Sequence, residues 1–476
     1  MTDINTNTEK RYDEDGIEMV ASKKEILGYA CGAPGQNLMS QFINNSTYFY
    51  TEKVGIYAGS VGTIQSVSMI LDAVSDIIFG KILDRTNTKE GKCRPWLKRM
   101  IFPLFLAIMS LVCVPNISPS GKVAYALISQ IFTRAVVLTV TNLSLTGLLN
   151  YMTKSSAERG LFGTMGTVFS NISGCIANML LIPMTNLLGG DQRAWIIVGA
   201  IMGVLAMILM FIAYKSTTER VKNASDTTGE KAVDEDAGVS VLKSLSILLH
   251  NKYWIFMLFA NLCIMVFYVL QGGTEAYYCK YILGNDNYVV YVNVVALAFM
   301  ALAFFTAPKI VNRFSMRTVA LIGLGIAGGC NLIRIIFPYN FWSFVIGFGV
   351  ELYGVNLAAS VLQPMTMCTT EVNDYKYHHR LTGMTGSAVS FASKFAGAGG
   401  SILVSQVLVI SGYNPVAEVQ AASAKFGLAV LNMHLHILVI VIAAIFFALY
   451  NLEKKYPELV ALNSERRAKE AEAAQA

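Results

Sequence analysis

Charged residues are scarce in this chain of 476 residues: Asp, Glu, Lys and Arg make up 14% of it, whereas a soluble protein usually has about 25%. Hydrophobic residues account for 54%, and apolar runs of roughly 20 residues recur along the whole sequence, long enough to cross a bilayer core as helices. The scarcity of charge therefore excludes an ordinary soluble domain and predicts an all-α polytopic membrane protein.

Short catalytic and nucleotide-binding motifs are also missing. The sequence has no HExxH, nucleophile elbow, Walker loop or GxGxxG after a strand. Its eight cysteines are scattered without a CxxC pair, which argues against a zinc site or a disulfide framework. We therefore expect no enzyme and no cofactor, and we keep a membrane enzyme or receptor only as a remote alternative.

The apolar runs predict twelve transmembrane helices in two six-helix halves. A polar connection that cannot bury enough apolar surface to fold alone separates the halves. The predicted domains are a cytoplasmic N-terminal tail (1–24), an N-terminal bundle (25–214), a cytoplasmic linker (215–250), a C-terminal bundle (251–450) and a cytoplasmic C-terminal tail (451–476). The predicted spans are 25–50, 54–83, 100–114, 122–150, 160–186, 194–214, 251–280, 287–307, 318–337, 340–368, 381–411 and 429–450.

Basic residues predict the orientation, because short cytoplasmic loops are enriched in Lys and Arg. Placing both termini in the cytoplasm puts most of the 37 basic residues on that side, with a dense group in the 85–99 loop. Twelve helices in this arrangement, with a cytoplasmic linker, are typical of a major facilitator transporter, whose substrate site lies near the midplane between the halves.

Two carboxylates, Asp72 and Asp76, lie one turn apart in the second predicted span. Because a charge inside a membrane is costly, each needs a partner, water or a function. The i, i+4 spacing puts both on one helix face, and hard carboxylate oxygens suit Na⁺, Li⁺ or a proton. The pair predicts a coupling-ion site, with structural acids bonded to Lys or Arg of other helices as the alternative.

Other polar residues fall at a similar depth in spans 1, 4, 7 and 11. Amide, hydroxyl and charged groups that line a wet cavity suit a small polar solute, although ordinary hydrogen bonds between helices are the alternative for any single Ser, Thr or Asn. A role in a structural ion network is left open for Arg134, Arg334 and Glu351. The candidates that this pattern gives for solute contacts are Asn37, Gln41, Asn142, Thr146, Glu275 and Lys394.

Three segments resemble one transporter family. They are "LDAVSDIIFGKILDRTNTKEGKCRPW", "GTEAYYCKYILGND" and "EVNDYKYHHRLTG". The first is the most specific, because it joins the acidic pair to a GK-x-RPW loop. The sequence resembles the glycoside–pentoside–hexuronide:cation symporters of the major facilitator superfamily, over nearly the whole of both halves.

The resemblance implies roles for individual residues. Asp72 and Asp76 match the family's cation-binding carboxylates, and Thr139 matches a span 4 threonine of the same site. Lys394 matches a lysine near both the sugar and the cation. Asn142 stands where the family has a span 4 acid that also touches the cation, so an amide oxygen would replace a carboxylate there.

The chain departs from the family's galactoside pocket. Asn37 and Asn142 stand at the places of sugar-binding carboxylates, while Thr146 and Thr167 stand at those of a stacking Trp and a span 5 Arg. Glu275 is expected to supply an acid from the opposite half. These differences argue against a melibiose carrier and leave the identity of the sugar, glycoside, pentoside or uronide open.

The resemblance further implies alternating access in a bacterial inner membrane, with a small polar solute and a monovalent cation as ligands. An uncoupled uniporter and a carrier of an amphiphilic, lipid-like solute are the alternatives. The loop after span 2 resembles the superfamily's gating motif, with plain positive-inside anchoring as the other interpretation. The predicted cytoplasmic gate consists of Asp84, Arg85, Gly91, Lys92 and Arg94.

Overall fold

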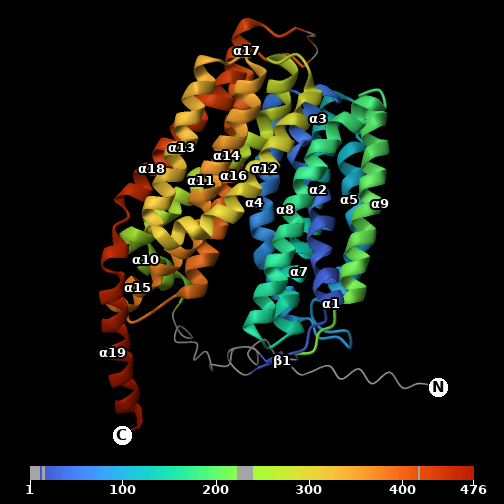
Figure 1. Ribbon diagram of the computed structural model, residues 1–476. Helices are drawn as coiled ribbons and strands as arrows, with labels where there is room; N and C mark the ends of the chain where they lie inside the picture. The colour runs from blue at the N-terminus through green and yellow to red at the C-terminus, as the bar shows by residue number, and fades with distance from the viewer. Residues whose placement is uncertain (1–10, 13–16, 222–239, 416, 418, 476) are drawn as a thin grey trace, which may run out of the picture.

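The protein is almost entirely helical in the computed structural model, which describes residues 11–12, 17–221, 240–415, 417 and 419–475 (Figure 1). A two-residue antiparallel pair, β1 (Arg11–Tyr12) and β2 (Glu18–Met19), precedes the helices. The helices of the first half are α1 (Lys23–Ala30), α2 (Gly32–Asn44), α3 (Ser46–Glu52), α4 (Ala58–Arg85), α5 (Arg94–Val112), α6 (Pro119–Ile131), α7 (Thr139–Met152), α8 (Ser156–Leu187) and α9 (Gln192–Ser216).

The second half has a matching set of long helices. A π-helical turn joins α17 to α18, as another joins α6 to α7 in the first half. The helices are α10 (Val241–His250), α11 (Lys252–Tyr281), α12 (Val289–Arg313), α13 (Met316–Ile336), α14 (Phe341–Cys368), α15 (Thr370–Tyr377), α16 (Thr382–Ile410), α17 (Ala422–Ala429), α18 (Leu435–Leu449) and α19 (Tyr456–Gln475).

Among the described residues, ten helical segments are long and apolar enough to cross a membrane. The first two predicted spans are not among them. Span 1 is divided at Cys31 and Asn45 into α1, α2 and α3, and α4 carries Asp72 and Asp76 in its middle. With 28 residues, α4 is nevertheless about 42 Å long. The predicted all-α class is therefore confirmed, while the count of twelve spans stays a prediction.

The predicted linker and C-terminal tail both contain helix. The last part of 215–250 forms α10, and residues 222–239 lie outside the described residues. The tail forms α19, which packs against α15, where Asn463 donates a hydrogen bond to the Glu371 carboxylate (2.9 Å). The predicted bounds of the two bundles stay a prediction.

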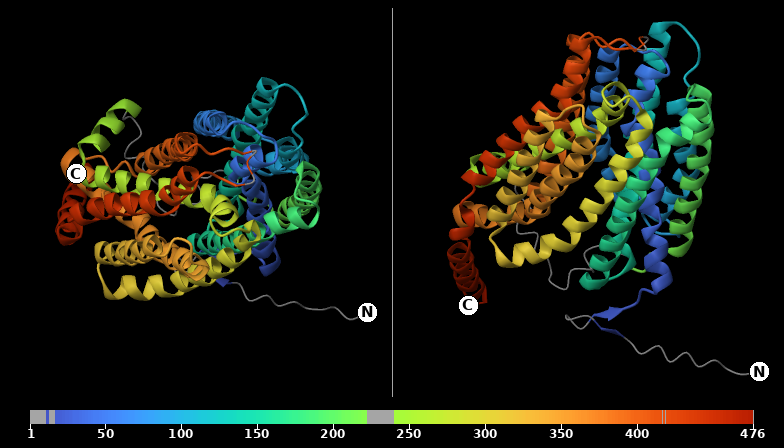
Figure 2. Two further views of the ribbon diagram at one scale, coloured as in Figure 1. Left: turned by 90° about the horizontal axis from the view of Figure 1, so that it is seen from above. Right: turned by 45° about the horizontal axis from the view of Figure 1, so that its top comes forward.

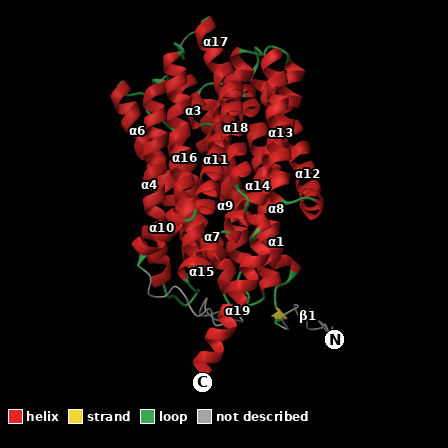
Figure 3. Cartoon of the chain, turned by 90° about the vertical axis from the view of Figure 1, so that its left-hand side faces the viewer, coloured by secondary structure: helices red, strands yellow, loops and turns green. Residues whose placement is uncertain are grey.

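The two halves lie side by side with their long helices running in the same general direction (Figures 1 and 2). β1, α10, α15 and α19 lie at one end, which we call the terminal end (Figures 1 and 3). α3 and α17 lie at the other, which we call the far end.

The apolar core is distributed unequally between the ends. One core, which includes Phe42 and Trp195 of the first half, continues into far-end residues of the second half such as Tyr277 and Leu408. A separate core, represented by Met257, lies within the second half toward the terminal end. The halves therefore share a core at the far end and have separate cores toward the terminal end.

Helices α4 and α16 make the closest contact between the halves. The Ser405 hydroxyl donates to the carbonyl of Ala58 and accepts from the backbone N–H of Gly62 (3.2 Å). One turn further, the Ser66 hydroxyl donates to the carbonyl of Ala398 (2.8 Å). A Cβ on Gly62 would lie 2.3 Å from that of Ser405, so glycine permits this approach. This row of contacts leads from the far end to the middle of the molecule.

Candidate functional site

Asp72 and Asp76 lie where the α4–α16 contact reaches the middle of the molecule. Both face Lys394 of α16, whose Nζ lies 2.7 Å from Asp72 Oδ2 and 2.5 Å from Asp76 Oδ2. The Asp72 side chain is 13% exposed and that of Asp76 is 31% exposed. One ammonium therefore bridges two carboxylates across the halves, which leaves a formal charge of −1 in the group.

A π-helical turn, Phe132–Leu138, brings Thr139 to this cluster. Such a turn adds a residue to the helix and changes the direction of the side chains that follow. The Thr139 hydroxyl donates to Asp72 Oδ1 (2.7 Å) and lies 2.9 Å from the hydroxyl of Ser75. The predicted grouping of Thr139 with the acidic pair is thus present in the structure.

A cavity of about 270 Å³ opens beside the cluster. It brings together most of the residues predicted to bind the cation or the solute, with additional polar groups from Gln36, Ser40 and Ser170. Asn37 is oriented by Ser170, whose carbonyl and hydroxyl accept from its Nδ2 (2.5 and 2.9 Å). The predicted residues that line this cavity are Asn37, Asp72, Asp76, Thr139, Asn142 and Lys394.

A second cavity of about 440 Å³ lies between the two halves. Asp72 and Lys394 line this cavity as well, so they stand between the two spaces. Its other lining includes Gln65 and Arg134 from the first half and Tyr268 from the second. Its volume falls in the range of small-molecule sites, about 300–1,000 Å³, and its walls include both polar and apolar groups.

Arg134 is buried beside this second cavity without an acidic ion-pair partner among the described residues. Its guanidinium donates to Gln65 Oε1 (2.8 Å) and to Gln130 Oε1 (3.3 Å). The two glutamines hold the Arg134 guanidinium within the first half, near Asp72.

Four predicted solute residues lie outside the lining of both cavities. The hydroxyls of Thr146 and Thr167 donate to carbonyls of their own helices, 2.5 and 2.9 Å away. Gln41 lies next to Gly174 of α8. Glu275 is buried among asparagines of α8 and α12.

The predicted gate loop is bound to its own half in this conformation. Its backbone wraps the Glu219 carboxylate, which accepts from the N–H groups of Lys92 (2.7 Å), Cys93 (2.8 Å) and Arg94 (2.8 Å). This carboxylate caps the start of α5, where it also complements the helix dipole. Gly91 has φ +110°, and a Cβ there would lie 2.1 Å from Glu219 Oε2.

Glu90 of this loop is paired, whereas Arg85 at the end of α4 is exposed. Glu90 accepts from Lys98 (3.1 Å) and from the Tyr214 hydroxyl (3.2 Å), and the hydrogen bond from Lys98 lowers the pKa of the Glu90 carboxyl. The side chain of Asp84 lies outside the described part of the chain, so the proposed charge pairs of the gate stay a prediction.

Arg334 and Glu351 form a buried network in the second half. They make an ion pair with each other, and Glu351 also lies 2.9 Å from Nδ1 of His436. Asn331 donates to Glu351 (2.9 Å), and Arg334 donates to Asn432 (2.7 Å). The second half thus contains the structural ion network that the sequence left open for these two residues, whereas Arg134 is not part of it.

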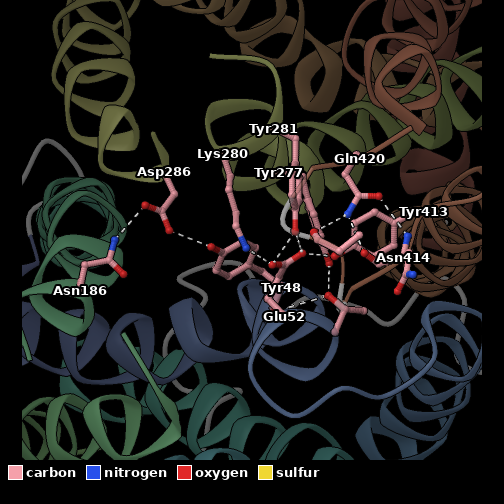
Figure 4. Close-up of polar contacts among 12 residues, drawn as sticks. Tyr48, Glu52, Asn186, Tyr277, Lys280, Tyr281, Asp286, Tyr413, Asn414 and Gln420 are labelled. Atoms are coloured by element: carbon pink, nitrogen blue, oxygen red, sulfur yellow. Dashed lines mark hydrogen bonds and ion pairs between the residues drawn. The ribbon is translucent and has the colours of Figure 1, made fainter. Parts of the chain in front are cut away.

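A polar cluster that the sequence did not reveal closes the far end (Figure 4). Its centre is Glu52 at the end of α3, whose side chain is 1% exposed. Tyr281 donates to this carboxylate (2.7 Å), which also binds Lys280 and the hydroxyl of Tyr413. All three partners belong to the second half. We call Glu52, Lys280, Tyr281 and Tyr413 the far-end seal.

Two neighbouring contacts strengthen the closure at this end. Asp286 accepts from the hydroxyl of Tyr48 (2.8 Å) and from Nδ2 of Asn186 (2.9 Å) (Figure 4). The hydroxyls of Thr51 and Tyr277 lie 2.6 Å apart. The first half is therefore joined to the second through α3, α8 and α11, and the far end is closed in this conformation.

Two helical bundles with cavities between them, closed at one end, define a membrane transporter of the major facilitator type. A family model described as MFS/sugar transport protein matches residues 28–454. The chain belongs to this family, and its multi-pass membrane character follows. The predicted resemblance to glycoside–pentoside–hexuronide symporters is confirmed by the relatives below.

Curated relatives from bacteria cover most of the chain. The isoprimeverose transporter of Lactiplantibacillus pentosus is 26% identical over 437 residues, which cover 89% of this chain and 87% of that protein. The inner membrane symporter YicJ of Escherichia coli is 25% identical and covers 84% and 85% of the two chains. The putative glycoside/cation symporter YagG of the same organism is 24% identical, with 83% and 85% covered.

Solved structures share the fold at much lower identity. A bacterial homologue of the lysosomal transporter Spinster, described as inward-facing and unoccupied, has a TM-score of 0.66 at 13% identity and covers 92% of this chain and 98% of that one. The xylose transporter XylE of Escherichia coli has a TM-score of 0.59 at 12% identity, with 90% and 97% covered. At these identities the likeness supports the fold alone.

Proposed function

We propose that the protein is a cation-coupled symporter of a sugar-like polar solute that works by alternating access. The observation that carries the proposal is the bridge from Lys394 to Asp72 and Asp76, because it combines a charge-binding site with a contact between the halves. Symporter and sugar-transporter names among the relatives support the same assignment.

The coupling cation would bind at the acidic pair. Two carboxylates and one ammonium leave one negative charge, which a single Na⁺, Li⁺ or H⁺ neutralises. Carboxylate, hydroxyl and amide oxygens are hard ligands that suit such ions. We assign the site to Asp72, Asp76, Thr139 and Asn142, all of which line the smaller cavity.

The solute would occupy the spaces on either side of the Asp72–Lys394 pair. Asn37 and Asn142 offer amide groups to solute hydroxyls, and Lys394 would contact both the solute and the cation site. Because Lys394 belongs to the second half, solute binding would alter the contact between the halves. Roles for Gln41, Thr146 and Thr167 stay predictions, since these residues lie outside both cavities in this conformation.

Alternating access assigns the two ends of the molecule to the two sides of a bacterial cell membrane. Helix α4 runs from the far end, so the basic 85–99 segment at its end lies toward the terminal end, and the positive-inside rule puts this segment in the cytoplasm. The far-end seal would then face outward. The cycle would be completed when the far-end seal opens and the gate loop closes the inner side. The gate loop contains Arg85, Gly91, Lys92 and Arg94.

The first test needs no knowledge of the solute. The melting temperature of the purified protein is measured in NaCl, LiCl and KCl at two pH values, beside the Asp76→Asn variant. A ligand that binds only the folded state raises apparent stability. We expect a rise specific to Na⁺ or Li⁺, or a rise on acidification, that the variant loses. Equal behaviour of both proteins would contradict the coupling site.

The second test addresses the solute. Proteoliposomes are given an inward gradient of the activating cation. Uptake of isoprimeverose and of a panel of pentosides, glycosides and uronides is then measured. We expect accumulation of at least one sugar that collapses with the cation gradient. Flux that equilibrates without any cation dependence would indicate a uniporter, and competition by lysolipids alone would indicate an amphiphilic solute.

A further inference from the structure

Glu275 lies between the halves, beneath the far-end seal. It precedes Tyr281 on α11 by six residues, or roughly 9 Å along the helix, and it is 4% exposed. Asn293 of α12 donates to its Oε1 (2.6 Å), and Asn178 of α8 donates to its Oε2 (3.4 Å). Asn178 belongs to the first half, whereas Glu275 and Asn293 belong to the second.

The carboxyl of Glu275 has only amides as hydrogen-bond partners among the described residues. Three other buried carboxylates have basic partners: Asp72 has Lys394, Glu52 has Lys280 and Glu351 has Arg334. A buried charge without a counter-ion costs several kcal/mol, even after the protein relaxes. The amide N–H groups of Asn293 and Asn178 offset only part of this cost, because one of them lies 3.4 Å from its carboxyl oxygen. Burial without a counter-ion therefore favours the neutral acid.

In the part of the chain that the structure describes, no basic group contacts the Glu275 carboxyl. The thiols of Cys175 on α8 and Cys279 on α11 are its titratable neighbours. Asp286, in the turn after α11, is engaged with Tyr48 and Asn186 instead. From α12 the facing group is the amide of Asn293.

The hydrogen bonds around Glu275 continue into the first half. Asn178 also donates to Asn293 Oδ1 (3.0 Å), and its own Oδ1 accepts from Asn45 Nδ2 (3.1 Å). Two residues of each half thus form one chain, Asn45–Asn178–Asn293–Glu275. Opening the far end must separate Asn178 from Asn293 and admit water to the Glu275 carboxyl, where the ionised form is well solvated.

We propose that Glu275 is a proton-binding site distinct from the Asp72/Asp76/Lys394 group, occupied while the far end is closed and emptied when it opens. The proton enters from far-end water as the halves close and returns to the same water when they part. Net proton transport is therefore zero, and the site makes closure of the far end sensitive to the pH on that side. The link to closure rests on the proposed alternating access; the proton site itself does not.

The proton is tested by infrared spectroscopy on the full chain purified at neutral pH. We expect a C=O stretching band of a protonated carboxylic acid in the wild type that is absent from Glu275→Gln and unchanged in Glu90→Gln, which removes an exposed carboxylate. A wild type without such a band, or a band that survives in Glu275→Gln, would overturn the proposal.

A second variant guards against misfolding of the first. Asn293→Leu removes the donor that lies 2.6 Å from the carboxyl and keeps Glu275 itself. We expect the band to remain but to move to higher frequency, because a C=O group that loses a hydrogen bond stretches at higher energy. An unmoved band would show that the proton belongs to another acid and would contradict the assignment.

The link to closure is tested by hydrogen–deuterium exchange. Amide exchange in residues 277–288, corrected for the intrinsic effect of pH, should be slower at pH 6 than at pH 8 in the wild type and equal at both in Glu275→Gln. A pH effect that persists in the variant would overturn the link. Because no substrate or Na⁺ is used, this result is separate from the melting test of Asp76→Asn, and either can fail alone.

Discussion

Lys394 of α16 and Asp76 of α4 form an ion pair of 2.5 Å that joins the two halves at the middle of the molecule. The other α4–α16 contacts, from Ala58–Ser405 to Ser66–Ala398, lie between this pair and the far end. The pair therefore belongs at once to the candidate cation site and to the boundary of the interface. A change in charge at Asp76 must alter the interface as well.

Replacing Lys394 with Met should strengthen cation binding. The two carboxylates would then face each other without a counter-charge, so a bound ion would relieve a repulsion that the lysine now relieves. We expect an apparent affinity for the activating cation about tenfold tighter, or ~1.4 kcal/mol, measured from the dependence of melting temperature on salt. Concentrative uptake should be lost.

The matched control for this variant is Lys81→Met, which removes an exposed lysine from α4, the helix that carries Asp72 and Asp76. It should leave the apparent affinity unchanged. Weaker cation binding in Lys394→Met would show that the ammonium helps to build the site and would contradict the expectation.

Glu52→Gln should loosen the far-end seal. The amide keeps the size of the side chain but removes the charge that binds Lys280, and it weakens the hydrogen bonds from Tyr281 and Tyr413. Charged hydrogen bonds contribute about 1.5–3 kcal/mol each, so we expect amide exchange in residues 277–288 to become at least about tenfold faster. The control Glu90→Gln lies in the gate loop at the other end of the molecule and should leave this exchange unchanged. Faster exchange of residues 277–288 in the control would mean a global loss of stability.

Glu351→Gln should destabilise the second half without removing the cation effect. The change would leave the buried guanidinium of Arg334 without its counter-ion, and breaking a buried pair costs about 3–5 kcal/mol. We expect a lower melting temperature that still rises with the activating cation. The double variant Arg334→Met/Glu351→Leu should be more stable than the single one, and a less stable double variant would argue against an electrostatic origin.

Gly91→Ala should disrupt the gate loop. The added methyl would lie 2.1 Å from the Glu219 carboxylate at a residue with φ +110°, and such backbone strain costs about 1–3 kcal/mol. A fall in melting temperature is expected. Gly80→Ala is the control, because a Cβ at Gly80 in α4 would meet nothing within 4 Å; equal losses in both variants would contradict this account.

The parts of the site that sequence could predict are those set by local spacing or by resemblance. The i, i+4 relation places Asp72 and Asp76 on one face of a helix, independently of the tertiary structure. Lys394 lies more than 300 residues further along the chain, and only the resemblance connected it with the pair. Its position across both carboxylates is a product of packing between α4 and α16.

The far-end seal could not be predicted in the same way. Glu52 meets Tyr281 and Tyr413 across separations of 229 and 361 residues, and no short motif marks such a contact. Thr146 and Thr167 were predicted to contact the solute, but in the structure each hydroxyl donates to a carbonyl of its own helix. Polarity alone does not distinguish this use from solute binding.

The unequal division of the apolar core has an energetic consequence for the empty carrier. Opening the far end would separate residues such as Tyr277 and Leu408 from the core they share with the first half. Each 100 Å² of apolar surface exposed to water in this way costs about 2.5 kcal/mol. In the proposed cycle this burial adds to the polar seal in favouring a closed far end in the unloaded protein, and energy from the cation gradient would be needed mainly to part that end.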